Sequence, residues 1–238
     1  MRVAALEVPA RWGAPDAQLE WVRGALDGCA ADLIVLPEAC LTGYVSPRGD
    51  WDPTALAEEI VGGPTTRAVA AIARERSAHV AFPLIERDAG AIYNACVVVA
   101  PNGAVIARYR KRHPWYPETW ATPGREPFAA IELGGARVVI AICFDVHFLE
   151  DEAAEALGGA DALVFPSAWF DDEPDVDARG AIFARLVRRF GITIVNANWG
   201  PGDVRVPGQG ASRVVGPGFD DRPGPRAWVA RTLRSRAG

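Results

Sequence analysis

The sequence of 238 residues predicts an α/β fold, in which helices cover the faces of β-sheets. Short runs of β-branched residues alternate with alanine-rich segments whose apolar side chains recur at helical spacing. The Asn102-Gly103 pair lies between two apolar runs, which is a strong hairpin signal, so we expect mixed rather than purely parallel sheet structure. Half of the residues are apolar and 23% are charged, as in ordinary soluble proteins with a buried core.

The individual elements follow from these patterns. Strands are predicted over Arg2–Val8, Leu33–Leu36, His79–Leu84, Ile92–Val99, Ala104–Tyr109, Arg137–Ile142, Ala162–Phe165, Ile192–Val195, Ser212–Val215 and Ala227–Ala230. Helices are predicted over Asp16–Cys29, with Asp16 as the N-cap, Pro64–Ser77, with proline in the first turn, Leu149–Leu157 and Asp177–Phe190. Loops rich in glycine, proline and aromatic residues are expected over Pro37–Asp52, Arg112–Phe128 and Trp199–Gly210. Because no repeat or long linker divides the chain, residues 1–238 are predicted to form a single domain.

Composition and charge exclude several classes of partner. The 25 Lys and Arg residues against 30 Asp and Glu give a net charge of −5, which argues against a nucleic-acid partner, and no apolar run is long enough to span a membrane. The three histidines, His79, His113 and His147, lack metal-ligand spacing, and no glycine-rich phosphate loop follows a strand, so we expect no metal and no cofactor. The four cysteines lack C-x-x-C spacing and the N-terminal run is too short for a signal peptide, which favours a cytoplasmic location.

Three predicted strands end beside a chemically reactive side chain. Glu38 and Cys143 each follow an apolar run, and Lys111 follows Ala107-Arg108-Tyr109-Arg110. Ligands of α/β proteins usually lie where strands end, so these three residues could converge there. A carboxylate, an ammonium and a thiol suffice for acyl transfer, because the carboxylate removes the thiol proton and the cation stabilises the oxyanion. A nearby ammonium also favours the thiolate form of Cys143. Lys111 is the single lysine beside 24 arginines, and lysine differs from arginine in offering a compact charge that can also release a proton.

Each of these residues also has a simpler interpretation. Cys143 follows an apolar run, where a buried core thiol is the commoner case, and Glu38 is in a position typical of a solvated loop carboxylate. Lys111 lies among arginines and fits a charged surface. His113, next to Lys111, permits a Cys-His pair, but the order of the residues favours Glu-Lys-Cys and leaves His113 as a supporting or surface residue.

Several segments together resemble the nitrilase, or carbon-nitrogen hydrolase, superfamily. Three of them resemble its signature motifs and follow its order of Glu, Lys and Cys: Leu36-Pro37-Glu38-Ala39-Cys40-Leu41-Thr42-Gly43-Tyr44, Tyr109-Arg110-Lys111-Arg112-His113 and Ile142-Cys143-Phe144-Asp145-Val146-His147-Phe148. The resemblance extends over nearly the whole chain through Tyr93-Asn94-Ala95, Thr122-Pro123-Gly124, Phe165-Pro166-Ser167-Ala168-Trp169 and Gly210-Ala211-Ser212.

The resemblance implies both a fold and a set of roles. The fold is a four-layer α-β-β-α sandwich of two mixed sheets, and subunits of the superfamily frequently pair, so we expect a homodimer or a higher homo-oligomer. Cys143 is implied as the nucleophile, Glu38 as the general base and Lys111 as the group that stabilises the tetrahedral intermediate, with the backbone N–H of Phe144 as second oxyanion donor. Glu118 matches in position a further glutamate that holds the amide or assists deacylation, and a plain loop carboxylate is its alternative.

The residues after Cys143 favour an amide substrate over a nitrile. Phe144-Asp145 is similar to the Tyr-Asp of amidases and carbamoyl hydrolases, whereas nitrilases tend to have Trp-Glu there. We therefore expect hydrolysis of a small amide or carbamoyl compound through a cysteine thioester, with release of ammonia or an amine. Tyr44, Trp115, Phe144 and Trp169 are expected to bind the substrate, and Trp120 and Trp199 lie in or beside the same loops. A nitrilase, an acyl-transferring enzyme and a catalytically silent relative are the alternatives.

Overall fold

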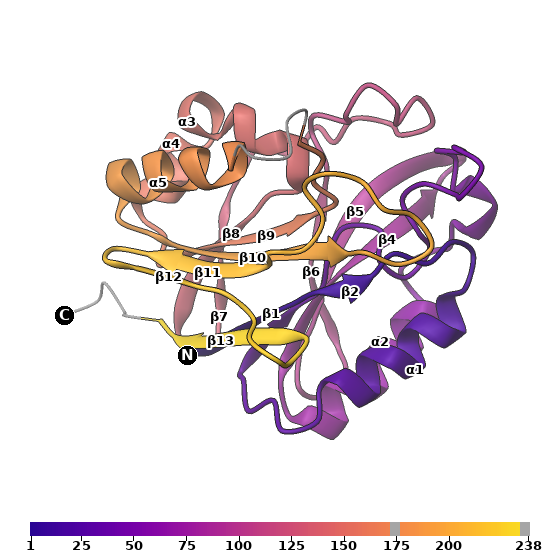
Figure 1. The fold of residues 1–238 in the computed structure, drawn as a ribbon, viewed down its shortest axis with the longest axis horizontal. Helices are drawn as coiled ribbons and strands as arrows, with labels where there is room; N and C mark the ends of the chain where they lie inside the picture. The colour runs from indigo at the N-terminus through magenta and orange to yellow at the C-terminus, as the bar shows by residue number, and fades with distance from the viewer. Residues whose placement is uncertain (172–176, 234–238) are drawn as a thin grey trace.

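Two mixed β-sheets pack face to face between two layers of helices (Figure 1). The computed structural model describes residues 1–171 and 177–233, and the elements given below belong to these two ranges. The architecture is the four-layer α-β-β-α sandwich that the resemblance implies, so the predicted α/β class is confirmed.

Both sheets have parallel strands at their centre and antiparallel strands outside. In the described ranges the first sheet contains, in spatial order, β13 (Trp228–Thr232), β1 (Arg2–Leu6), β3 (Leu33–Val35), β4 (His79–Asp88), β5 (Ala91–Val99) and β6 (Val105–Arg110). The second contains β12 (Phe219–Asp221), β11 (Arg213–Gly216), β10 (Thr193–Gly200), β9 (Ala162–Ser167), β8 (Ala136–Ile140) and β7 (Ala130–Leu133), with β2 (Val8–Pro9) paired to β10. The strands β1, β3 and β4, and likewise β8, β9 and β10, are parallel to one another.

The helices form the two outer layers. Two of them, α1 (Pro15–Ala25) and α2 (Pro64–Arg76), cover the first sheet. The second sheet is covered by α3 (Leu149–Glu152), α4 (Ala154–Gly158) and α5 (Ala178–Phe190). Two short 3₁₀ turns, η1 (Thr54–Leu56) and η2 (Cys143–His147), complete the elements. The side chain of Asp177 caps α5 by accepting a hydrogen bond from the Gly180 N–H at 2.8 Å, in agreement with the predicted helix start.

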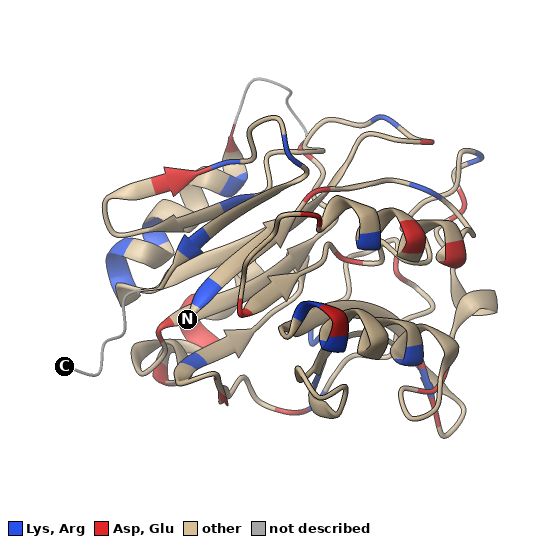
Figure 2. Ribbon diagram, turned by 90° about the horizontal axis from the view of Figure 1, so that it is seen from below, with Lys and Arg blue, Asp and Glu red and all other residues tan. Residues whose placement is uncertain are grey.

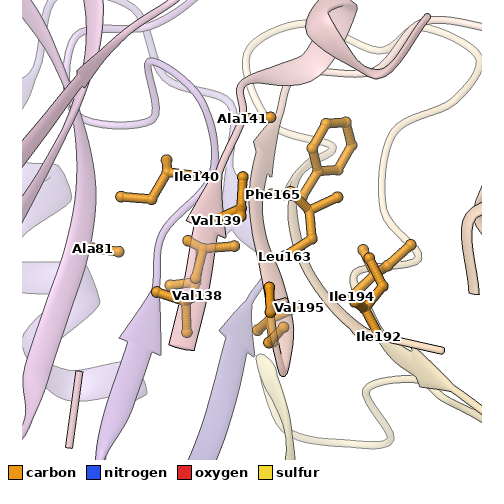
Figure 3. Close-up of a cluster of buried hydrophobic side chains, with 14 of the residues drawn as sticks. Ala81, Val138, Val139, Ile140, Ala141, Leu163, Phe165, Ile192, Ile194 and Val195 are labelled. Atoms are coloured by element: carbon orange, nitrogen blue, oxygen red, sulfur yellow. The ribbon is translucent and has the colours of Figure 1, made fainter. Parts of the chain in front are cut away.

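The central strands of the second sheet are buried on both faces, which explains their continuous apolar sequence. Figure 3 shows Val138, Val139 and Ile140 of β8 beside Leu163 and Phe165 of β9 in this cluster. Ala81 of β4, in the first sheet, belongs to the same cluster. The strand that leads to Cys143 is therefore held firmly by packing from both sides.

Charged residues lie mainly on helices, loops and strand ends, and the two signs are interspersed (Figure 2). In the described ranges no helix is long and apolar enough to cross a membrane.

The structure differs from the sequence predictions at several elements. Strand β7 was not predicted. It forms a hairpin with β8 through Gly134 and Gly135, whose φ values of +55° and +81° are those of a tight turn that glycine adopts without steric cost. Strands β2 and β12 were also missed. The helix predicted over Leu149–Leu157 is interrupted at Ala153 and forms α3 and α4. Asp16 is not an N-cap, because α1 begins at Pro15, which suits the first helical position and leaves Asp16 inside the first turn.

Candidate active site

Two of the predicted reactive side chains form a buried ion pair. Glu38 lies just beyond β3 and Lys111 directly beyond β6. The Lys111 Nζ atom is 2.7 Å from Glu38 Oε1, and each residue is only 1% exposed. An unpaired charge at this depth would be strongly disfavoured, so each group needs the other in order to stay ionised.

Glu118 joins the same pair from the loop that follows β6. Lys111 Nζ lies 2.9 Å from each of its carboxylate oxygens. The Tyr44 hydroxyl donates to Glu118 Oε1 at 3.0 Å, and the Trp115 backbone N–H donates to Oε2 at 2.7 Å. Glu118 is thus a buried carboxylate with several donors, and the alternative of a plain solvated loop residue does not describe its position.

Asn94 connects the two glutamates, and the sequence analysis assigned it no role. Its Nδ2 atom, on β5, donates at 2.8 Å both to Glu38 Oε1 and to Glu118 Oε1. Lys111 and Asn94 therefore act as two donors between the same two carboxylates. The Tyr93-Asn94-Ala95 segment was part of the family resemblance, and this was the one sequence signal that pointed to the residue.

Cys143 begins the turn η2, immediately after the chain leaves β8. Its φ of +43° lies in the left-handed region, which is costly for a residue other than glycine. This conformation turns the chain sharply into η2. Cys143 is buried at 8% exposure but lines a cavity of about 300 Å³, unlike Glu38 and Lys111, which do not line it.

The backbone N–H of Ala168, beyond β9, brings Cys143 and Glu38 together. It donates to Glu38 Oε2 at 2.9 Å and also faces the Cys143 sulfur. The charges of Glu38 and Lys111 both act on the Cys143 thiol. Glu38 and Lys111, at strand ends of the first sheet, are thus in direct contact, and the charges of both act on Cys143, which follows a strand of the second sheet.

Opposing effects set the pKa of Cys143. Burial raises this pKa well above its ordinary value, and the neighbouring Glu38 carboxylate raises it further. Lys111 lowers the pKa, as expected for an ammonium that favours the thiolate, and the Ala168 N–H acts in the same direction. Burial outweighs both, so the net shift is upward.

The two charged partners keep complementary protonation states. Burial raises the pKa of Glu38, although Lys111 partly offsets this effect. Burial alone would lower the pKa of Lys111, but the carboxylates of Glu118 and Glu38 outweigh it and raise that pKa above its ordinary value. Lys111 therefore stays a cation, and Glu38 has an increased affinity for a proton.

Asp145 is a second residue without a role in the sequence analysis, where it served only to favour an amide over a nitrile. It is fully buried and accepts three hydrogen bonds: from the Tyr109 hydroxyl at 2.7 Å, the His113 N–H at 2.9 Å and the Ile142 N–H at 3.0 Å. Tyr109 and His113 flank Lys111, and Ile142 precedes Cys143. Asp145 thereby fixes the two chain segments that carry these residues relative to each other.

The cavity beside Cys143 contains three of the four residues expected to bind substrate. Trp115, Phe144 and Trp169 line it, whereas Tyr44 does not and instead donates to Glu118. Trp120 and Trp199 do not line it either; the Trp199 indole N–H donates to the backbone oxygen of Trp169 at 3.0 Å.

His113 does not line the cavity that contains Cys143. Its ring stacks on Phe148 with 3.6 Å between centroids, and its Nε2 atom contacts Glu152.

In the described ranges no group of three or more His, Cys, Asp or Glu side chains is arranged to hold a metal ion.

The chain is similar in sequence to several known proteins. The family model described as carbon-nitrogen hydrolase matches residues 2–217. A nitrilase of Pyrococcus abyssi is 36% identical over 138 residues, which cover 58% of this chain and 52% of that protein. An (R)-stereoselective amidase of a Pseudomonas species is 28% identical over 219 residues, which cover 91% of this chain and 78% of that protein. The match thus spans about half the length of the Pyrococcus relative.

A solved structure has the same fold as this chain. It is a mutant of the Nesterenkonia AN1 amidase from the nitrilase superfamily, and it superimposes with a TM-score of 0.82 at 23% identity, covering 100% of this chain and 91% of that chain.

Proposed function

The chain belongs to the carbon-nitrogen hydrolase family, and from this premise we propose that it hydrolyses a small amide or carbamoyl compound through a thioester on Cys143. The observation that carries the proposal is the buried Lys111–Glu38 pair, whose charges act on Cys143, together with the cavity that Cys143 lines. Cys143, Cys96 and Cys40 all lie in hydrophobic clusters of the core, but of these three Cys143 is the one that lines this cavity.

In the first half of the proposed reaction Glu38 removes the proton from Cys143 Sγ as the sulfur attacks the amide carbonyl carbon. The raised pKa of Glu38 suits it to accept this proton. Lys111 Nζ has three N–H donors, and Glu38 and Glu118 accept from two of them, so the third is available for the oxyanion. We assign the second oxyanion donor to the backbone N–H of Phe144. The proton then passes from Glu38 to the leaving nitrogen, the C–N bond breaks, and ammonia or an amine departs.

In the second half water attacks the thioester. Glu38 takes a proton from the water, the C–S bond breaks, and the proton returns to the sulfur, which restores the thiol and releases the carboxylic acid. We assign to Glu118 and Asn94 the positioning of Lys111 and Glu38, because Glu118 accepts from Lys111, Asn94 donates to Glu38, and Asn94 also donates to Glu118.

The test is to measure ammonia release from short-chain and aromatic primary amides and, in parallel, from the nitriles that correspond to them. We expect amide turnover, and we expect Cys143→Ala to reduce kcat by at least about 10⁴-fold without lowering the melting temperature. Turnover of nitriles alone would assign the chain to nitrilases, which the Pyrococcus abyssi relative makes the main alternative. Faster product formation with hydroxylamine than with water would favour acyl transfer, and no turnover of any of these compounds would favour a silent relative.

We further propose that residues 1–238 act as one catalytic domain, that subunits associate as a homodimer or larger homo-oligomer, and that the protein is cytoplasmic. Light scattering coupled to size exclusion tests the association, and cell fractionation tests the location.

A further inference from the structure

The cavity that contains Cys143 combines aromatic walls with one carboxylate. Trp115, Tyr116, Phe144, Trp169 and Phe170 supply the rings, and Asp171 supplies the carboxylate. His147 and Cys143 also line the cavity. Burial lowers the pKa of His147 below its ordinary value and raises that of Cys143, so both are uncharged near neutral pH. Among the lining residues that the structure describes, Asp171 is therefore the one that carries a charge.

Asp171 is held in a fixed position. Its Oδ1 atom accepts a hydrogen bond from the Trp169 indole Nε1 at 2.7 Å, and its backbone N–H donates to the Pro207 oxygen at 3.2 Å. Gly208, with a φ of +89°, comes so close that a Cβ atom there would lie 2.7 Å from the Asp171 nitrogen. No residue in ranges 1–171 and 177–233 donates a hydrogen bond to the second oxygen, Oδ2, and we assign this oxygen to the ligand.

The rings beside Asp171 form a packed group. Trp115 stacks on Phe170 with 5.2 Å between centroids, and Tyr116 lies 4.6 Å from Trp115 at the exposed rim. The face of an aromatic ring attracts cations, and a carboxylate adds a charge-assisted hydrogen bond to an ammonium. Rings and a carboxylate in one small cavity are together suited to a cationic group.

Two arginines lie near the cavity without lining it. The charge of Arg179 acts on Asp171, and its guanidinium carbon lies 6.0 Å from the centre of the Trp169 ring. Arg179 is 3% exposed and does not line the cavity, and its Nη2 atom donates to the backbone oxygens of Gly210 and Ala211. Arg185 is paired with Glu150 at 2.6 Å and does not line the cavity. The cluster behind Cys143 holds Glu38, Glu118 and Lys111, so it contributes a net negative charge.

Building on the proposed amide hydrolysis, we infer that the acyl chain of the substrate carries an amine or guanidine cation, which Asp171 and the neighbouring rings bind while the amide lies at Cys143. When a primary amide loses ammonia, the acyl chain is the rest of the molecule. Asp171 is thus a specificity-determining residue of the same site.

The test compares ω-amino amides of graded chain length with neutral alkyl amides of the same length. We expect kcat/KM of the wild-type protein to favour at least one cationic amide by about tenfold or more over its neutral counterpart. Asp171→Asn keeps an oxygen for the Trp169 indole but removes the charge, and it should lower this ratio by about the same factor. Asp27→Asn, which removes a charge from an exposed surface pair, is the matched control and should leave the ratio unchanged.

The inference would be overturned if the wild-type protein turned over both series equally, or if it preferred amides that bear a carboxylate. It would also be overturned if Asp171→Asn did not lower the ratio of kcat/KM between cationic and neutral amides. Each of these results leaves the proposed hydrolysis standing.

If neither series is hydrolysed, the proposed function fails, and calorimetry with butylammonium chloride still tests the cation site. Butylammonium binding to the wild-type protein that is weaker in Asp171→Asn supports the site, and the absence of binding to the wild-type protein refutes it. The comparison of cationic with neutral amides needs only the wild-type protein. It therefore still tests the inference if the Asp171→Asn variant does not fold.

Discussion

Replacement of Lys111 by methionine leaves two buried carboxylates without their cation. Glu38 Oε1 and Glu118 Oε1 lie 2.7 and 2.9 Å from Lys111 Nζ, so the two oxygens are at most about 5.6 Å apart, the sum of these distances. Two full charges at that separation repel by about 3 kcal/mol at an effective dielectric constant of about 20. Loss of one partner from a buried ion pair costs about 3–5 kcal/mol, and we expect Lys111→Met to lower the free energy of unfolding by this amount at neutral pH.

The same variant should show a defined pH dependence. Lys111 lowers the pKa of Glu38, so its removal raises that pKa further above the value in the unfolded chain. A carboxyl group whose pKa is higher in the folded protein favours folding at low pH, and this contribution is lost as pH rises through the folded-state pKa. The difference in unfolding free energy between wild type and Lys111→Met should therefore be small near pH 4 and should grow toward pH 7.

Urea unfolding at several pH values measures this difference. The double variant Lys111→Met with Glu38→Gln removes one of the two carboxylate charges and should recover most of the lost stability at neutral pH. Arg185→Met, which breaks the half-exposed pair with Glu150, is the surface control and should cost less than about 1 kcal/mol. A Lys111→Met effect below about 1 kcal/mol, or one independent of pH, would refute the reasoning.

Three further predictions concern the same site. Asp145→Asn places an NH₂ group among three buried donors, so we expect a loss of about 1–3 kcal/mol in unfolding free energy together with a lower kcat, and an unchanged kcat would contradict the positioning role. Because burial raises the pKa of Cys143, the rate of its alkylation by iodoacetamide should still be rising at pH 9, and a plateau below pH 7 would indicate a stable thiolate instead. Glu118→Gln should lower kcat by at least about tenfold while KM changes little, since Glu118 lies behind the cavity, and steady-state kinetics with a raised KM alone would assign it to substrate binding.

Much of the site was predictable because the reactive residues stand just beyond predicted strands. Apolar runs mark the strand ends before Glu38 and Cys143, and the order of these two residues, with Lys111 between them, matches the family. The roles that were not predicted depend on contacts between residues far apart in the sequence, and the sequence pattern does not show such contacts. Asn94 is one polar residue inside a buried strand, and its position between two glutamates follows from the pairing of β5 with β6.

The net upward shift of the Cys143 pKa was not predictable from the sequence, for a related reason. The sequence shows one lysine that favours the thiolate, but the pKa depends on burial and on how many carboxylates surround that lysine. Similarly, strand β7 was missed although Gly134-Gly135 is a turn signal, because the apolar run before it is short. Local sequence predicted which residues reach the site, and tertiary packing set their charges.

The most direct test of the central claim is the intact mass of the protein quenched in acid during steady-state turnover of an amide. We expect the protein mass to increase by the mass of the acyl group of the substrate, and we expect peptide mapping to locate this group on Cys143. Cys143→Ala should carry no such adduct. An adduct on another residue, or amide turnover that survives Cys143→Ala unchanged, would contradict it.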